Sequence, residues 1–389
     1  MLNFEIITPT RIVFGKDQLG RLPELLNTIA PNRKVMLAFG GGSIRKNGML
    51  DALLNALADF HVVQFSGIEP NPEFQTLMNG VELFKKEQLD CILAVGGGSV
   101  IDGVKFMTGA IKYAGDPWDV LEKKDGCLFE DAIPFGAVLT LPATGSEANS
   151  GAVISRSEWK QKRAMGGPLF FPKFAFCDPT VVATLPERQL ANGVVDAFMH
   201  TLEQYITVPT GNLLQERQAE AILLTLKEVG PLVMKDPSNY ELAANLMWSA
   251  THALLGFLRC GVPTDWTTHM IGHELTALYG IDHARTLAII APRLYENQFE
   301  NKKAKLVQYG KRVWDLTGTE DEIAHQAIAK TEAFFHQLGI PTHISSYTES
   351  GDEAPEIIRN RFIERGWTAM GERQAITTDD VFAIVEKAR

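Results

Sequence analysis

CILAVGGGSVID, residues 91–102, joins an apolar strand to a glycine turn and the start of a helix. The unbroken apolar run CILAV predicts a strand that is buried on both faces, as in parallel sheets. The turn Gly96-Gly97-Gly98-Ser99 lets the backbone come close to a phosphate, and the N-terminus of the following helix offers N–H groups to an anion. The stretch therefore predicts a parallel α/β sheet with an anion-binding turn at one strand end.

A second glycine turn follows another short apolar run upstream. Residues 34–39 read KVMLAF and end at Gly40-Gly41-Gly42-Ser43. Neither turn matches G-x-G-x-x-G or carries the Lys-Ser/Thr of a P-loop, so either one alone could be a tight turn that merely needs a positive φ. Two such turns, both at strand ends of a parallel sheet, favour a dinucleotide site.

Strand and helix signals alternate through the first half of the chain and change near Pro186. Apolar runs at 61–65 and 135–141, with helical patterns at 47–60 and 73–87, indicate β-α-β units. Beyond Pro186 only helical patterns follow, at 187–206, 214–229, 240–258, 265–279, 302–314, 321–338 and 356–365. We therefore predict an α/β dinucleotide-binding domain with a parallel sheet over residues 1–185, followed by an all-α metal-binding domain over residues 186–389.

Two segments of the first half carry additional expectations. Residues 4–14 could form an edge hairpin, with Pro9 in the middle. Residues 139–147, LTLPATGSE, are expected to join a strand to a helix, with Thr144 or Ser146 as the helix cap. Capping and ligand contact do not exclude each other in such a stretch.

Composition and charge exclude several classes of protein. The chain has 389 residues, of which 45% are hydrophobic and 22% charged, which is typical of a soluble globular protein with two domains. The net charge of -10 and the scattered Lys and Arg argue against nucleic-acid binding. No apolar run approaches the roughly 18 residues of a membrane helix, and the N-terminus lacks a signal-peptide pattern. The four cysteines, distant from one another, are typical of reduced thiols in a cytoplasmic protein: Cys91, Cys127, Cys177 and Cys260.

The strongest chemical signal lies in the helical half. Asp196 and His200 are four residues apart in NGVVDAFMH, so a helix places both on one apolar face. His269 and His273 repeat the spacing, and His283 follows. A buried Asp needs compensation, and carboxylate with imidazole suits Zn²⁺ or Fe²⁺. A metalloprotease is the rival interpretation, but the H-E-x-x-H pattern that begins at His273 ends in alanine.

The order of these motifs resembles the iron-containing (group III) alcohol dehydrogenases over essentially the whole chain, in the branch of NADPH-dependent aldehyde reductases and butanol dehydrogenases. The landmarks are Gly96 to Asp102, LPATGSE at 141–147, Asp178-Pro179, Asp196/His200, Gly272-His273 and His283. The resemblance implies the dehydroquinate synthase-like fold and a catalytic divalent metal.

The resemblance also implies roles for individual residues. The metal ligands would be Asp196, His200, His269 and His283, with His273 beside the metal and the nicotinamide in a catalytic position. The residues expected to bind the cofactor are Gly40, Gly41, Ser43, Asn71, Gly97, Gly98, Ser99, Asp102, Thr140, Leu141, Thr144, Val153 and Lys162. A departure lies at Asp282-His283-Ala284, where many relatives have Pro-His-Gly; the histidine is kept.

Cofactor preference follows from a second departure. NAD-preferring relatives place an Asp near the position of Gly41, where it would hold the ribose hydroxyls. Glycine there removes the repulsion against a 2′-phosphate, and Ser43, Arg45 or Lys46 could donate to that phosphate. We therefore predict NADP(H) in preference to NAD(H).

The predicted function is hydride transfer between NADP(H) and a short- to medium-chain aldehyde or alcohol, with Fe²⁺ or Zn²⁺ bound, in a cytoplasmic homodimer. One alternative is a non-redox, NAD-using metal lyase of the dehydroquinate synthase-like type. Such enzymes handle anionic substrates, yet residues 196–205 and 265–283 contain no Lys or Arg. A metal- or redox-sensing protein without turnover is the other alternative, although no effector-binding appendage is recognisable.

Overall fold

The computed structural model describes residues 1–126 and 128–389, so Cys127 lies outside the described residues. The chain divides into two compact units. The α/β unit consists of residues 7–185 and 237–247, and the helical unit consists of residues 1–6, 186–236 and 248–389. The predicted division differs from these units in two segments, because residues 1–6 group with the helical unit and residues 237–247 with the α/β unit.

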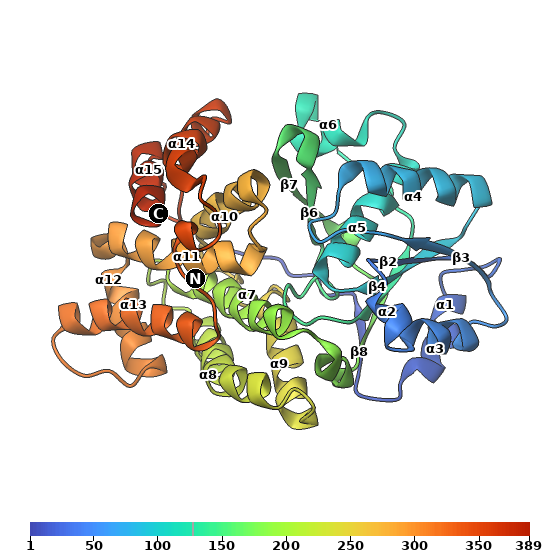
Figure 1. Cartoon of the computed structure of the whole chain (residues 1–389), viewed down its shortest axis with the longest axis horizontal. Helices are drawn as coiled ribbons and strands as arrows, with labels where there is room; N and C mark the ends of the chain where they lie inside the picture. Colours follow the sequence, from blue (N-terminus) through green and yellow to red (C-terminus); the bar gives the residue numbers. More distant parts are fainter. Residues whose placement is uncertain (127) are drawn as a thin grey trace. The chain divides into compact units, whose positions relative to one another are not determined.

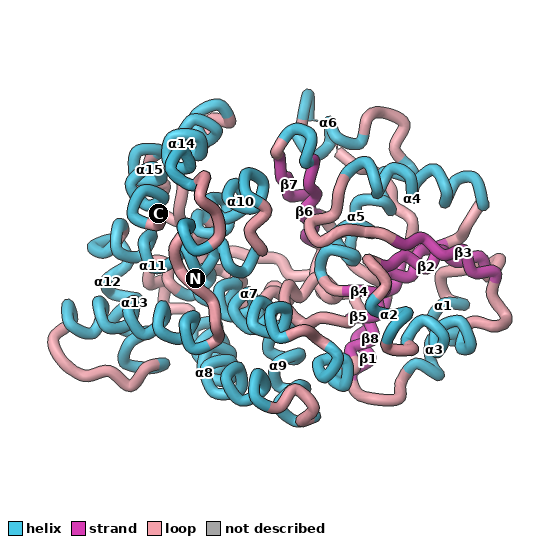
Figure 2. Tube along the Cα trace, in the orientation of Figure 1, coloured by secondary structure: helices cyan, strands magenta, loops and turns pink. Residues whose placement is uncertain are grey.

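The α/β unit is built on six parallel strands in the order β1-β8-β5-β4-β2-β3 (Figure 2). Their bounds are β1 Arg11–Phe14, β2 Lys34–Phe39, β3 His61–Ser66, β4 Cys91–Gly96, β5 Phe135–Leu139 and β8 Phe174–Cys177. The chain runs outward from β2 to β3 on one side and from β4 to β5 on the other, so the order reverses between β2 and β4. Both predicted glycine turns follow these two adjacent strands.

Helices cover both faces of this sheet (Figure 1). Along β2, Val35 and Leu37 pack in a core with α1 Leu22–Asn27 and α3 Met49–Ala56. Met36 and Ala38 point the other way, into a core with α4 Phe74–Glu87 and α5 Gly98–Lys112. The alternation of strand side chains between the two cores explains why these strands are apolar throughout.

Two expectations for this unit are wrong. Only β1 forms within residues 4–14, and it pairs parallel to β8 instead of folding into a hairpin. Residues 140–150 form turns, with no helix after β5. The side chain of Asn149 donates to Gly145 O within these turns, which competes with helix formation, and the hydroxyl of Ser146 donates to Asp102 instead of capping a helix. The chain then enters an antiparallel hairpin that we did not predict, β6 Gly151–Arg156 and β7 Gln161–Gly166.

The helical unit contains long helices, as predicted, although the helices at 283–297 and 378–387 were not among the predicted segments. They are α7 Glu187–Tyr205, α8 Leu213–Lys235, α10 Thr267–Tyr279, α11 His283–Asn297, α12 Phe299–Val313, α13 Glu320–Gln337, α14 Ala354–Glu364 and α15 Thr378–Lys387. Helix α9, Tyr240–Ala253, divides between the two units after Met247. Gly280 ends α10 with a φ of 69°, a left-handed conformation that glycine adopts without strain. The order of an α/β unit and then a helical unit confirms the predicted fold class.

The remaining helical elements are short. They are α2 Ser43–Lys46, α6 Pro117–Glu122, and the 3₁₀ turns η1 Leu19–Arg21, η2 Lys124–Gly126, η3 Ser157–Trp159, η4 Pro168–Phe170, η5 Pro179–Thr184, η6 Ile344–Ser346 and η7 Gly351–Glu353. Among the described helices, none combines the length and apolar character needed to cross a bilayer. Cys91, Cys177 and Cys260 are free and buried.

Candidate metal centre and cofactor turns

Four side chains of the helical unit converge on one point. Asp196 and His200 lie one turn apart on α7, His269 lies on the first turn of α10, and His283 begins α11. One potential ligand atom from each lies within 4.8 Å of every other. Asp196 Oδ1 is 3.8 Å from His200 Nε2 and 3.7 Å from His283 Nε2. The i, i+4 spacing in the sequence is thus realised on a helix face, as predicted.

The chemistry of this cluster fits a divalent cation. Asp196 is 3% exposed, and its Oδ1 accepts no hydrogen bond from the described residues. A buried carboxylate oxygen without a donor is costly unless a cation compensates it. One carboxylate and three imidazoles form a donor set that suits Zn²⁺ or Fe²⁺.

Glu203 adds a contact that sequence reasoning missed. Its buried carboxylate meets Nδ1 of His269, and its Oε1 accepts a hydrogen bond from the backbone N–H of His269 at 3.3 Å. Because Nδ1 is engaged, Nε2 is the nitrogen of His269 that is left to coordinate a metal. Burial and the neighbouring charge of Asp265 raise the pKa of Glu203 well above its usual range. The available signal was a carboxylate three residues after His200 on an apolar helix.

His273 lies beside the four side chains and outside their cluster. Its ring centroid is 5.1 Å from that of His283 and 6.2 Å from that of His269. The next residue, Glu274, is buried and forms ion pairs with Arg361 at 2.7 Å and Arg365 at 2.5 Å. Glu274 is therefore a structural ion-pair partner of α14, which agrees with the rejection of the metalloprotease pattern.

In the α/β unit, the turn after β4 is closely packed. Strands β2 and β4 pair in register from Val35↔Cys91 to Phe39↔Val95, so their turns lie at the same sheet edge. A Cβ added at Gly97 would lie 3.0 Å from Leu141 Cβ, and one added at Gly98 would lie 2.5 Å from Thr144 Oγ1. These glycines therefore allow residues 140–145 to pack closely against the turn.

Several predicted cofactor residues take part in two sets of hydrogen bonds. The backbone N–H of Asn71, whose φ is 61°, donates to Ser99 Oγ at 3.3 Å, and Lys162 Nζ donates to Asn71 Oδ1 at 2.9 Å. Asp102 Oδ2 accepts from the backbone N–H of Val153 at 2.9 Å. The structure thus brings residues that are distant in sequence together around the N-terminus of α5.

Lys105 belongs to the set of hydrogen bonds around Asp102 and was also missed. It is fully buried, and its Nζ donates to Ser146 Oγ at 2.7 Å, Gly151 O at 2.7 Å and Asn149 Oδ1 at 3.1 Å. Ser146 Oγ in turn donates to Asp102 Oδ1 at 2.6 Å. Burial lowers the pKa of Lys105 to about 8, against the opposing charge of Asp102. Together, Asp102 and Lys105 hold the turn from Thr144 to Val153 against α5.

The turn after β2 is more open. Gly42 has a φ of 103°, and a Cβ added at Gly41 would meet nothing within 4 Å. A Cβ at Gly40 would lie 3.7 Å from Val100, so the turn lies beside the first turn of α5. Arg45 packs over the ring of Phe39 at 4.9 Å. Among the described residues, Ser43 takes no part in the hydrogen bonds around Asp102. The backbone N–H of Thr140 donates to Gly96 O, at the end of β4, at 3.0 Å.

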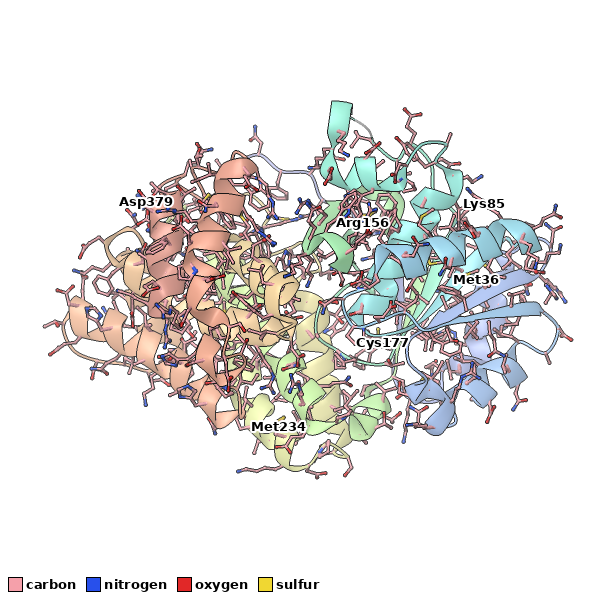
Figure 3. The ribbon with its side chains drawn as sticks, turned by 45° about the horizontal axis from the view of Figure 1, so that its top comes forward. Met36, Lys85, Arg156, Cys177, Met234 and Asp379 are labelled. Atoms are coloured by element: carbon pink, nitrogen blue, oxygen red, sulfur yellow. The ribbon has the colours of Figure 1, made fainter. Side chains whose placement is uncertain are left out.

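The β6–β7 hairpin contributes Val153 and Lys162 and is anchored by Arg156 (Figure 3). The guanidinium of Arg156 lies 3.2 Å from the ring centroid of Trp159 and 5.4 Å from that of Trp118. These cation–π contacts hold the end of β6 against Trp159 in the turn and Trp118 of α6.

Comparisons with known proteins assign both units to one family. Residues 9–179 match the family model "iron-containing alcohol dehydrogenase", and residues 190–389 match "Fe-containing alcohol dehydrogenase family, C-terminal". The NADPH-dependent aldehyde reductase YqhD of Escherichia coli is 50% identical over 392 residues, with 100% of both chains covered. NADH-dependent butanol dehydrogenase B of Clostridium acetobutylicum is 35% identical over 394 residues, again with 100% of both chains covered.

Solved structures give the same answer. The crystal structure of E. coli YqhD superposes with a TM-score of 0.96 at 50% identity, covering 100% of this chain and 99% of the other. NADH-dependent butanol dehydrogenase A of Thermotoga maritima superposes with a TM-score of 0.93 at 32% identity, with the same coverage. These matches confirm the resemblance drawn from the glycine turns and the Asp/His spacing. The chain belongs to the iron-containing alcohol dehydrogenase family.

Proposed function

We propose that the chain is a metal-dependent aldehyde reductase and alcohol dehydrogenase that transfers hydride between NADP(H) and a short- to medium-chain aldehyde or alcohol. The observation that carries the proposal is the convergence of Asp196, His200, His269 and His283 within 4.8 Å around a carboxylate oxygen that lacks a donor. The relatives named aldehyde reductase and butanol dehydrogenase support the substrate class.

The four converging side chains would hold Fe²⁺ or Zn²⁺, and Glu203 would fix the ring of His269 so that Nε2 faces the metal. When bound, the metal supplies a Lewis acid that polarises the carbonyl oxygen and stabilises the developing alkoxide. His273, beside this group, would supply or relay the proton that the alkoxide needs. Replacing His273 with Ala is expected to keep the metal and to lower kcat by about 100-fold or more; an unchanged kcat would remove this role.

In the α/β unit, the backbone N–H groups of Gly98 and Ser99 would bind the cofactor pyrophosphate at the N-terminus of α5. Asn71, Asp102 and Lys162 would shape the site through the hydrogen bonds around that terminus. The preference for NADP(H) is supported by the absence of a carboxylate at Gly41 and by the NADPH dependence in the name of the relative that is 50% identical. Four relatives at 35–39% identity carry NADH in their names and another at 35% identity carries NADP, so cofactor choice varies within the family.

The lyase alternative is not favoured. Its anionic substrates would need basic side chains close to the metal ligands. Arg285, the basic residue that follows His283, donates from Nε to Asn192 Oδ1 at 3.0 Å and lies 5.9 Å from the ring centroid of Tyr347.

We further propose a homodimer in the cytoplasm, with the cofactor bound by residues 1–185 and the metal by residues 186–389.

The first test is the absorbance of reduced nicotinamide during incubation with butanal, using NADPH or NADH, before and after chelation. We expect consumption that favours NADPH, is abolished by the chelator and returns with Fe²⁺ or Zn²⁺. No consumption by metal-loaded protein would overturn the proposed activity. Comparable kcat/KM values for the two cofactors would overturn the preference alone.

A further inference from the structure

Helix α7 supplies only two of the four candidate ligands, Asp196 and His200. The other two, His269 and His283, lie on α10 and α11. A ligand site needs all four side chains to be oriented before the metal arrives, since each misplaced ligand lowers the affinity. The question is therefore what orients the two histidines that α7 does not carry.

Glu203 of α7 contacts both the ring and the backbone of His269. One carboxylate oxygen meets the ring Nδ1, and the other accepts from the backbone N–H of His269. In addition, the backbone carbonyl of Glu203 accepts from the N–H of Asp265 at 3.2 Å, in the segment that leads into α10. Glu203 is 3% exposed, so these contacts are shielded from water and from salt.

Asp282, the residue before His283, accepts hydrogen bonds from the N-terminal part of α7. Its Oδ2 accepts from Arg188 Nε at 2.7 Å and from Asn192 Nδ2 at 2.8 Å. Asn192 Oδ1 also accepts from Arg285 Nε at 3.0 Å. His283 is thus bracketed by two residues, Asp282 and Arg285, which both bond to α7.

These contacts come from one broad face of α7. Arg188, Asn192, Asp196 and His200 follow one another at intervals of four residues, and Glu203 follows His200 after three. Residues at such spacings lie on the same side of a helix. The two ligands therefore stand in the middle of a stripe whose two ends contact the residues around the other two ligands.

We propose that α7 positions all four ligands: Glu203 orients His269, and Arg188 with Asn192 hold Asp282 and so orient His283. These are positioning residues, because none of them is placed among the atoms that bind the metal. The proposal rests on the metal site of the proposed function, and it predicts that metal affinity depends on side chains that do not touch the metal.

The test is the affinity of the full-length protein, stripped of metal, for Zn²⁺, measured by competition with a chromophoric chelator. Glu203→Gln and Asp282→Ala are each expected to weaken binding by about 10- to 100-fold. The matched control Glu187→Gln, on the exposed first turn of α7, is expected to bind as the wild type does. Co²⁺ bound to Glu203→Gln is expected to show shifted visible bands, since its coordination geometry changes.

A rescue variant separates positioning from folding. Asp282 has a φ of −54° and a ψ of 138° and directly precedes α11, a conformation that proline adopts. Asp282→Pro would hold the backbone before His283 without the contacts to α7, so its Zn²⁺ affinity is expected to lie within about threefold of the wild type. Asp282→Pro binding as weakly as Asp282→Ala would contradict backbone positioning.

The outcomes keep the two proposals apart. A wild-type protein that binds neither Zn²⁺ nor Co²⁺ would overturn the proposed function. A wild type that binds tightly, together with Glu203→Gln and Asp282→Ala proteins that bind equally tightly, would overturn the positioning role of α7. If Glu203→Gln does not fold, the Asp282 pair still decides the proposal, because that side chain is partly exposed.

Discussion

At the scale of single residues, Gly41 offers the sharpest test of cofactor choice. A Cβ added at this position meets no neighbour within 4 Å, and the φ of Gly41 is not in the left-handed region, so the backbone accepts an aspartate without strain. A carboxylate there would repel a 2′-phosphate and accept hydrogen bonds from ribose hydroxyls. Gly41→Asp is expected to lower kcat/KM for NADPH by about 10- to 100-fold, corresponding to roughly 1–3 kcal/mol, and to raise it for NADH.

The measurement is steady-state kinetics with both cofactors at fixed aldehyde. Gly41→Asn, which is similar in size but uncharged, is the matched control and should shift the ratio much less. If both variants change the ratio equally, the effect comes from bulk, and the charge argument is wrong.

The buried Lys105 predicts a pH dependence of stability. Its pKa falls from the ordinary 10.5 to about 8 in the folded protein because of burial. Between these two pH values the unfolded chain binds more protons than the folded protein. The free energy of unfolding therefore rises with pH in this window, and the contribution of Lys105 is lost as the pH falls through about 8. The contribution of this group is at most about 3 kcal/mol.

The check compares wild type with Lys105→Met by urea unfolding at several pH values from 7 to 10.5. The difference between the two proteins is expected to change across this window in favour of the wild type. A difference that is flat with pH would mean that Lys105 keeps an ordinary pKa. The same unfolding measurement at Lys162, which is also buried and donates to Asn71, gives a second buried lysine for comparison.

At the scale of elements, the pairing of α10 with α14 depends on one carboxylate. Glu274 on α10 is 1% exposed and is bound by Arg361 and Arg365. Glu274→Ala would leave two partly buried guanidinium groups without their partner, at a cost of about 3–5 kcal/mol. The exposed Glu228 on α8 is the control, and Glu228→Ala should cost less than about 0.5 kcal/mol.

Chemical denaturation of the metal-loaded proteins measures both costs. A loss for Glu274→Ala no larger than that of the control would show that the α10–α14 ion pairs add nothing to stability. Zn²⁺ affinity, measured on the same samples, is expected to change less than in Glu203→Gln, because the carboxylate of Glu274 bonds to Arg361 and Arg365.

Some helices and strands could be predicted from the sequence and others could not. The strands at 34–39 and 91–96 and the Asp/His pairs were predictable because apolar runs and i, i+4 spacing are local signals. Helix α11 was not predicted, and Pro292 in its interior is a residue that normally argues against a helix. The polar strand β7 forms by pairing with β6, which no local pattern records.

One physical reason explains why Glu203 and Lys105 could not be predicted as site residues. Glu203 and Lys105 are charged residues on helices, and spacing alone does not distinguish a buried charge from a solvated one. Their burial is decided by what packs against the helix, namely the segment before α10 for Glu203 and the turn at 144–151 for Lys105. The metal ligands were easier because histidine and aspartate at helical spacing already suggest a shared ion.

At the scale of the whole molecule, metal removal is expected to lower thermal stability. A metal that binds only the folded chain adds about 2.7 kcal/mol when its free concentration is 100 times the Kd. Chelation should therefore lower Tm, and Zn²⁺ or Fe²⁺ should restore it. Scanning calorimetry with and without chelator gives the measurement.

Asp196→Asn provides the complementary variant. Without metal, the buried carboxylate of Asp196 is unfavourable, so metal-free Asp196→Asn is expected to be at least as stable as metal-free wild type. The variant should gain little from added metal. A variant that is stabilised by Zn²⁺ as strongly as the wild type would contradict the ligand role of Asp196.

The passage of the chain between its two units bears on how such a protein can be divided or recombined. The chain passes from one unit to the other at four junctions, 6/7, 185/186, 236/237 and 247/248. Met247, from the short returning segment, is part of the apolar core of the α/β unit. A gene cut once after residue 185 would therefore yield a first half that lacks a core side chain. Swapping whole halves between relatives by a single crossover would combine residues 7–185 of one parent with residues 237–247 of the other, so such chimeras are expected to be less stable than grafts that carry both segments together.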